Sequence, residues 1–287
     1  MAEPTQPVIA IRTGGSEDSV RPGRFAPYRA VLASRARAQR SYRASFRLDL
    51  VSSALVAVVE LAEVLVLYRS VSALGGLSLA QVLLVFGLAD VGFSLASLGF
   101  GHVDDLPEHL RRGTIDVFYL RPQPVLAQLV TSDINLRRLA RAAVGLAALV
   151  VGLIVAGVPA TWRSAALVLL AVVCGTTISS ALYVAAGGLQ FLVIDGAEMT
   201  NSFVYGGRYA ATQPATVWVA PVRAIFGYLV PVTFCGYLPV LAMLRLPAPG
   251  WLPAWLAWCA PLAAVWAWGL ALACWRWGSR RYQGAGG

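Results

Sequence analysis

The sequence contains no lysine, and all 23 of its basic residues are arginines. A nucleotide-binding P-loop places a lysine on the phosphates, and an enzyme that works through a Schiff base uses a lysine amine. Both classes are therefore excluded for this chain. Any ATP that drives its activity has to be bound by a separate subunit.

Patterns typical of metal sites and of nucleophilic catalysis are also missing. The four cysteines all lie in apolar segments without a CxxC pair, and neither HExxH, GxSxG nor a Gly-rich phosphate loop occurs. His102 and His109 are seven residues apart with no cysteine near them. We therefore expect no catalytic residue, no metal and no cofactor in this chain.

Hydrophobic sequence, in contrast, is abundant. Hydrophobic residues make up 58% of the chain and charged residues only 13%, and the mean hydropathy is +0.67. Six apolar stretches cover residues 48–68, 79–101, 139–158, 164–194, 217–243 and 254–275. Each has about the 20 residues, or more, that an α-helix needs to cross a membrane. The pattern predicts an all-α, polytopic membrane protein with six transmembrane helices.

The arginines indicate how these helices are oriented. If both termini are cytoplasmic, 20 arginines fall on or near the inner side and three (Arg69, Arg163 and Arg245) on or near the outer side. This asymmetry is the positive-inside bias of membrane proteins. The net charge of +9 is thus explained by topology, and we expect no nucleic-acid partner.

Composition divides the chain into four parts. Residues 1–26 are polar without periodicity and are expected to form a disordered cytoplasmic tail. Residues 27–47 predict a basic, amphipathic helix on the inner membrane surface, where its arginines meet lipid head groups as a simple anchor or bind a partner. Residues 48–277 form the six-span domain, and 278–287 a cytoplasmic C-terminal tail.

A long polar segment, residues 102–138, separates spans two and three on the inner side. Pro107 suits the first turn of a short helix, with acidic residues near that end, and Gly113 suits its termination. Pro122 and Pro124 then interrupt the chain before a second helix that leads into span three. Asp104, Asp105, Glu108 and His109 suggest either a metal site or a solvated, protein-docking face, and the amphipathic pattern favours the latter.

The region around span five is less regular. We expect an inner loop at residues 195–214, and a break in span five near Pro231 because proline removes a backbone donor. The rest, to about residue 253, is expected to form a re-entrant or outer-surface element.

Three carboxylates fall inside predicted spans. Glu60 and Glu63 are three residues apart on one face of span one, and Asp90 lies at a similar depth in span two. Ionisable groups in a bilayer are costly and are functional candidates. Four alternatives remain for these carboxylates: lining a wet pathway, pairing with Arg223 or an arginine of another subunit, staying protonated, or forming a structural contact between helices.

Four motifs, in order, resemble those of type-2, exporter-like permeases of bacterial ABC (ATP-binding cassette) transporters, over residues 28–283. The first is Arg111-Arg112-Gly113-Thr114-Ile115-Asp116-Val117-Phe118-Tyr119-Leu120-Arg121-Pro122. The second is Glu198-x-x-Asn201-x-Phe203-x-Tyr205-Gly206-Gly207-Arg208-Tyr209. The third comprises Phe226-x-x-x-Val230-Pro231-Val232 and Tyr237-Leu238-Pro239, and the fourth is Trp275-Arg276-Trp277-Gly278-Ser279-Arg280-Arg281-Tyr282.

The resemblance implies a permease of a bacterial inner (plasma) membrane that pairs with a second permease, identical or homologous. Two copies of a cytoplasmic ATPase subunit would hold ATP and Mg²⁺. The short helix after span two would be the coupling helix that docks on the ATPase. The residues implied for this contact are Asp104, Asp105, Pro107, Glu108, Arg111, Arg112, Gly113, Asp116, Arg121 and Pro122, with Glu198 and Asn201 in the next inner loop.

Two other classes remain as alternatives. An ion-coupled secondary carrier would use Glu60, Glu63 and Asp90, and would often show an internal repeat, which we do not find. A membrane-embedded lipid-modifying enzyme or protease would have to use the Asp104–His109 stretch.

Overall fold

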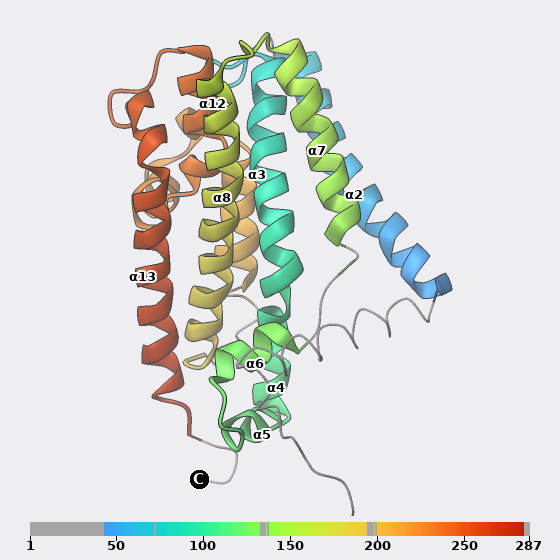
Figure 1. Cartoon of the computed structure of the whole chain (residues 1–287), viewed down its shortest axis with the longest axis vertical. Coiled ribbons are helices and arrows are strands. Elements are labelled where there is room, and N and C mark those ends of the chain that lie inside the picture. Colours follow the sequence, from blue (N-terminus) through green and yellow to red (C-terminus); the bar gives the residue numbers. More distant parts are fainter. Residues whose placement is uncertain are drawn as a thin grey trace, which may run out of the picture.

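The computed structural model describes residues 43–71, 73–132, 136, 138–193, 198 and 200–283. The structure is 79% helix, and no strand occurs among the described residues. The predicted tail at 1–26 and most of the basic helix at 27–47 lie outside the described residues. Figure 1 shows a bundle of long helices with several short ones at one end.

Among the described residues, five segments are long and apolar enough to cross a membrane. They correspond to α2 (Arg43–Ser70), α3 (Leu79–Phe100), α7 (Arg138–Val155), α8 (Trp162–Gln190) and α13 (Ala260–Ser279, preceded by the 3₁₀ turn η6, Ala254–Cys259). These match the predicted spans one to four and six. At 1.5 Å per residue, α3 alone is about 33 Å long, which is enough for the hydrocarbon core.

Helix α3 lies at the centre of the bundle, between α7 and α8, while α13 packs on α8 and α2 packs on α7 (Figure 1). Small residues allow these close approaches, as is usual between membrane helices. A Cβ on Gly87 of α3 would overlap the backbone of Leu149, and one on Gly152 of α7 would lie 2.8 Å from the Leu84 nitrogen. The helices α3 and α7 are therefore in backbone-to-backbone contact.

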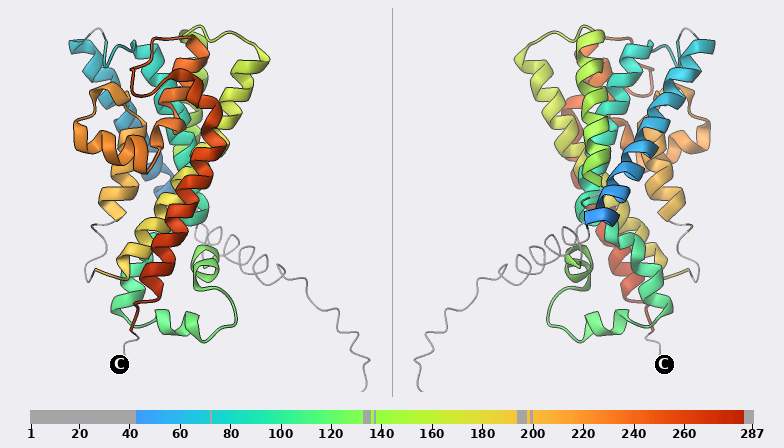
Figure 2. Two further views of the ribbon diagram at one scale, coloured as in Figure 1. Left: turned by 90° about the vertical axis from the view of Figure 1, so that its left-hand side faces the viewer. Right: turned by 90° about the vertical axis from the view of Figure 1, so that its right-hand side faces the viewer.

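The fifth span differs from the prediction. Residues 200–211 form helical turns, η2 (a π-helix, Thr200–Tyr205) and α10 (Gly206–Ala211), that pack on α3 and α8. The expectation of an inner loop at 195–214 is therefore wrong for these residues, because Gly207 and Arg208 are buried in the bundle. In Figure 2 this segment rises from the inner end toward the short helices that follow.

Residues 215–244 form a chain of short elements instead of one straight span. They are η3 (Ala215–Val217), α11 (Ala220–Arg223), the π-helix η4 (Ala224–Leu229), η5 (Val232–Cys235) and α12 (Tyr237–Leu244). The predicted break near Pro231 is confirmed, since η4 ends at Leu229 and Val230 is extended.

The segment after α3 folds into η1 (Gly101–Asp105), α4 (Leu106–Arg111), α5 (Ile115–Tyr119) and α6 (Val125–Thr131). Gly113 has a φ of +67° between α4 and α5, and α6 follows Pro124, as predicted. These helices lie at the same end of the bundle as the end of α13 (Figure 1). We call this the inner end, following the arginine distribution.

We expect Gly87→Ala to destabilise the chain by about 1–3 kcal/mol, because the added methyl overpacks the contact between α3 and α7. Gly99→Ala in the same helix is the control, since its Cβ would meet nothing within 4 Å. The thermal midpoint of the purified protein in detergent measures both. Equal midpoints for the two variants would contradict this account of the packing.

Candidate functional site

Four charged side chains from four helical elements meet inside the bundle. They are Glu60 of α2, Asp90 of α3, Arg141 of α7 and Arg208 of α10, and we call them the charge cluster. Asp90 is fully buried, and Arg141 and Arg208 are less than a tenth exposed. Asp90 is about 17 Å along α3 from its start, so the charge cluster lies near the middle of the span.

Each arginine contacts both carboxylates. Arg208 donates from Nη2 to Asp90 Oδ1 at 2.6 Å and from Nη1 to Glu60 Oε1 at 3.1 Å. Arg141 donates from Nε to Asp90 Oδ1 at 3.3 Å and from Nη2 to Glu60. The two positive and two negative groups cancel, which is the arrangement that a low-dielectric interior demands.

Neighbouring residues shape the charge cluster. The guanidinium of Arg208 lies 5.3 Å from the ring centre of Phe93, a cation–π geometry. A Cβ on Gly145 would lie 2.9 Å from Asp90 Oδ2, so a glycine there leaves room for the carboxylate. Glu63 is exposed and accepts a hydrogen bond from the Tyr209 hydroxyl at 3.3 Å. Glu60 and Glu63 thus share one face, as predicted from their spacing.

Arg223, which the sequence offered as a partner for these acids, lies elsewhere. It donates to the Trp218 carbonyl at 3.2 Å, and its guanidinium is 5.0 Å from the ring centre of Trp251. Sequence reasoning missed Arg141 and Arg208, because it assigned both to the inner side. The available signal was that two acids buried among apolar residues require cations within reach of a long side chain.

A second set of contacts connects the charge cluster to the inner end. The Tyr205 hydroxyl donates to Asp104 Oδ2 at 2.8 Å, and Arg138 donates to the Tyr205 oxygen at 3.3 Å. Tyr205 precedes Arg208 by three residues, about one helical turn. The segment 200–211 therefore touches η1 through Tyr205 and the charge cluster through Arg208.

Helices α4 and α5 form the surface of the inner end. Glu108 forms salt bridges of 2.6 Å with Arg111 and 2.5 Å with Arg112. The most exposed large hydrophobic side chains here are those of Val117 and Tyr119 in α5 and of Leu120, which follows it. The His109 ring contacts Thr114 and Phe118, and no group of three metal-ligating side chains occurs in the part of the chain that the structure describes.

The end of the described chain packs against α5. The Tyr282 hydroxyl donates to Asp116 Oδ1 at 3.0 Å, and its ring stacks on Tyr119 with the centres 5.8 Å apart and the planes 9° apart. Burial and the bond to Asp116 raise the pKa of Tyr282 to about 12, so the phenol keeps its proton and remains a donor at neutral pH. A cavity of about 310 Å³ lies beside this contact, lined by Pro107, Leu110 and Phe191 among others.

The family model of the ABC-2 family transporter proteins matches residues 54–286, which includes the charge cluster and the inner-end helices. The chain belongs to the ABC-2 transporter family. No curated protein and no solved structure matches it. The membership and the five apolar spans make this ABC-2 chain a multi-pass membrane protein with a transport role, and permeases of the family generally work with ATPase subunits.

The residues that the resemblance assigned to ATPase contact are distributed unevenly in this ABC-2 chain. Asp105, Arg111, Arg112, Arg121 and Pro122 are exposed, and so is Glu198. Pro107 is buried, and Asp104 and Asp116 accept hydrogen bonds from the hydroxyl groups of Tyr205 and Tyr282. Gly113 forms the turn, and Asn201 lies in η2.

Arg208→Gln leaves two carboxylates beside one arginine, and we expect a loss of about 3–5 kcal/mol in stability. Adding Asp90→Asn to this variant removes the excess negative charge and should restore part of the loss. Arg69→Gln, at an exposed site on the outer end of α2, controls for removal of an arginine alone. Thermal midpoints in detergent report all three, and an Arg208→Gln midpoint equal to that of Arg69→Gln would refute the pairing.

Proposed function

We propose that this chain is the permease subunit of an ABC exporter. Two permeases, identical or homologous, would form the substrate pathway in a bacterial inner membrane. Two cytoplasmic ATPase subunits would bind ATP and Mg²⁺ and drive it. Family membership supports the permease role, and the absence of lysine agrees with ATP hydrolysis on another subunit.

The observation that carries the coupling part of this proposal is the contact between Tyr205 and Asp104. In the proposed mechanism, ATP-driven closure of the ATPase subunits moves α4 and α5. That movement reaches segment 200–211 through Asp104 and Tyr205, and the charge cluster through Arg208. The segment suits such a role because it is short, contains a π-helix and is followed by further breaks.

The exposed residues around α4 supply a docking face of mixed charge. Asp105 and the two adjacent arginines, Arg111 and Arg112, are exposed on consecutive turns, and Leu120 is 86% exposed just after α5. Together with Val117 and Tyr119 it exposes apolar surface, and an apolar patch with a polar rim is typical of a protein contact. In this proposal Gly113 and Pro122 fix the turns that present the face, while Glu198 and Asn201 of the next segment contribute to the ATPase contact.

The carrier alternative is not favoured by the charge cluster. A proton-coupled carrier needs a carboxylate that gains and loses a proton during transport, whereas Glu60 and Asp90 are each held by two guanidinium groups. The enzyme alternative is not favoured either, because its candidate catalytic residues do not converge. His109 contacts Thr114 and Phe118, whereas Asp104 accepts a hydrogen bond from Tyr205.

Purification of the tagged chain from its own membranes in mild detergent should recover a P-loop ATPase in equal amount. Mass spectrometry of the complex would identify the ATPase and show whether the second permease is the same chain. A chain recovered alone, with bound lipid retained, would contradict the exporter proposal.

Gly113→Val should uncouple that complex. Valine is strongly disfavoured at a φ of +67°, so the turn between α4 and α5 would have to rearrange. We expect normal membrane insertion, together with loss of the permease-dependent part of ATP hydrolysis in the purified complex.

Gly76→Val is the matched control, because Gly76 has a φ of +85° with open space around it but lies in the outer loop between α2 and α3. It should keep the permease-dependent ATP hydrolysis. Equal hydrolysis by the Gly113→Val and Gly76→Val complexes would refute the coupling role of α4 and α5.

A further inference from the structure

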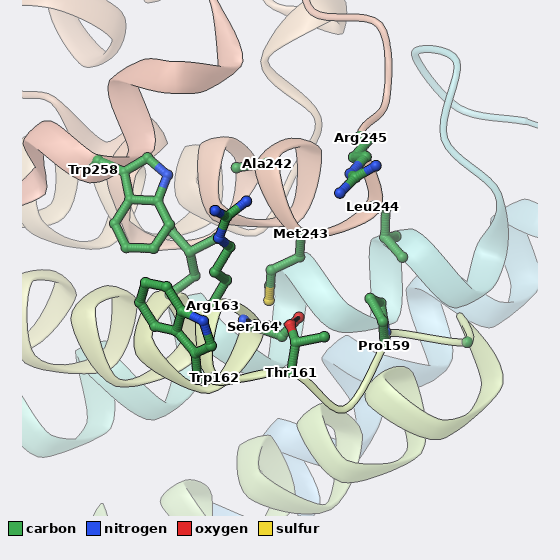
Figure 3. Close-up of a pocket in the computed structure, with 12 residues that line it drawn as sticks. Pro159, Thr161, Trp162, Arg163, Ser164, Ala242, Met243, Leu244, Arg245 and Trp258 are labelled. Carbon is green, nitrogen blue, oxygen red and sulfur yellow. Dashed lines mark hydrogen bonds between the residues drawn. The ribbon is translucent and has the colours of Figure 1, made fainter.

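A pocket of about 780 Å³ opens at the outer end of the bundle (Figure 3). Three regions far apart in the sequence form it: the loop after α7 with the first turn of α8, the last turn of α12, and Trp258 of η6. Figure 3 shows Arg163 rising from α8 toward α12, and Arg245 at the end of α12. The volume falls within the range of about 300–1,000 Å³ that small-molecule sites occupy.

The positive charge of this pocket is not balanced by the chain itself. Arg163 and Arg245 are two of the three arginines on the outer side, and none of the 14 acidic residues falls in the outer segments 70–78, 156–163 or 244–259. Neither arginine forms a salt bridge with any residue that the structure describes, in contrast to Arg141 and Arg208. The positive end of the α8 dipole also lies at the pocket.

Most of the other lining residues are apolar, while Thr161 and Ser164 contribute hydroxyl groups. Leu167 and Met243 are buried, and the indoles of Trp162 and Trp258 lie together on one side of the pocket (Figure 3). Farther along α8 and near the start of α13, Leu169 and Leu262 are 65% and 71% exposed, as expected of side chains that face lipid. Tryptophans are enriched at this depth, where hydrocarbon gives way to head groups.

We propose that this pocket binds an anionic amphiphile from the membrane, with its phosphate or carboxylate on Arg163 and Arg245. The planar guanidinium groups suit bidentate bonds to either anion. The apolar part would lie along Leu167, Met243 and Trp258. A bilayer lipid fits better than a free anion, because a free anion leaves this apolar wall uncovered.

The test measures lipid retained by the full chain in native mass spectrometry. Phosphatidylglycerol is the anionic probe, phosphatidylcholine the zwitterionic one, and inorganic phosphate the free anion. We expect retention of phosphatidylglycerol over phosphatidylcholine, and binding at least about tenfold weaker in the double variant Arg163→Gln/Arg245→Gln. Arg69→Gln, the third outer arginine, lies outside the pocket and should behave like the unmodified chain.

The double variant Arg163→Lys/Arg245→Lys keeps the charge and should keep most of the binding, which separates loss of charge from a folding defect. Equal retention of the two lipids, or unchanged retention in the glutamine variant, would overturn the proposal. Displacement of phosphatidylglycerol by an equal concentration of phosphate would overturn the lipid assignment, because the anion alone would then suffice.

Discussion

The structure depends on the mutual neutralisation of four charges in the middle of a lipid-facing bundle. Removing charge from water is expensive, and the hydrocarbon core offers no counterion. Glu60, Asp90, Arg141 and Arg208 therefore have to be brought together by the folding of four separate elements. Helix α2 gains most from this, since most of its described residues are exposed and its main packing partner is α7.

The same constraint explains which parts of the fold could be predicted. Five spans follow from length and apolarity alone, because a helix is the simplest way to satisfy the backbone in lipid. The turn at Gly113 and the break near Pro231 follow from local backbone chemistry. The helices at 200–211 could not be found in this way, because Arg208 makes the segment appear polar and its counterions are 118 and 148 residues away in the sequence.

The candidate site was likewise predictable only in part. The carboxylates were identifiable because acidic residues stand out in apolar runs, but their partners were not. An arginine near the end of a predicted span is usually assigned to the inner surface, and only tertiary packing shows that its side chain turns inward. The contact between Tyr205 and Asp104 was also hidden, since hydrogen bonding across 101 residues leaves no periodic signal.

The shared contacts of the charge cluster constrain how segment 200–211 can move. Both carboxylates touch both arginines, so withdrawal of Arg208 leaves Arg141 near Glu60 and Asp90 together with one uncompensated negative charge. That charge is tolerated only if water or another cation enters as Arg208 leaves. Glu60 is the more exposed of the two carboxylates, so water would reach it first. Movement of segment 200–211 would therefore require water or a cation to enter the charge cluster, and under the proposed coupling a switch driven from the inner end would open a polar path at the centre of the span.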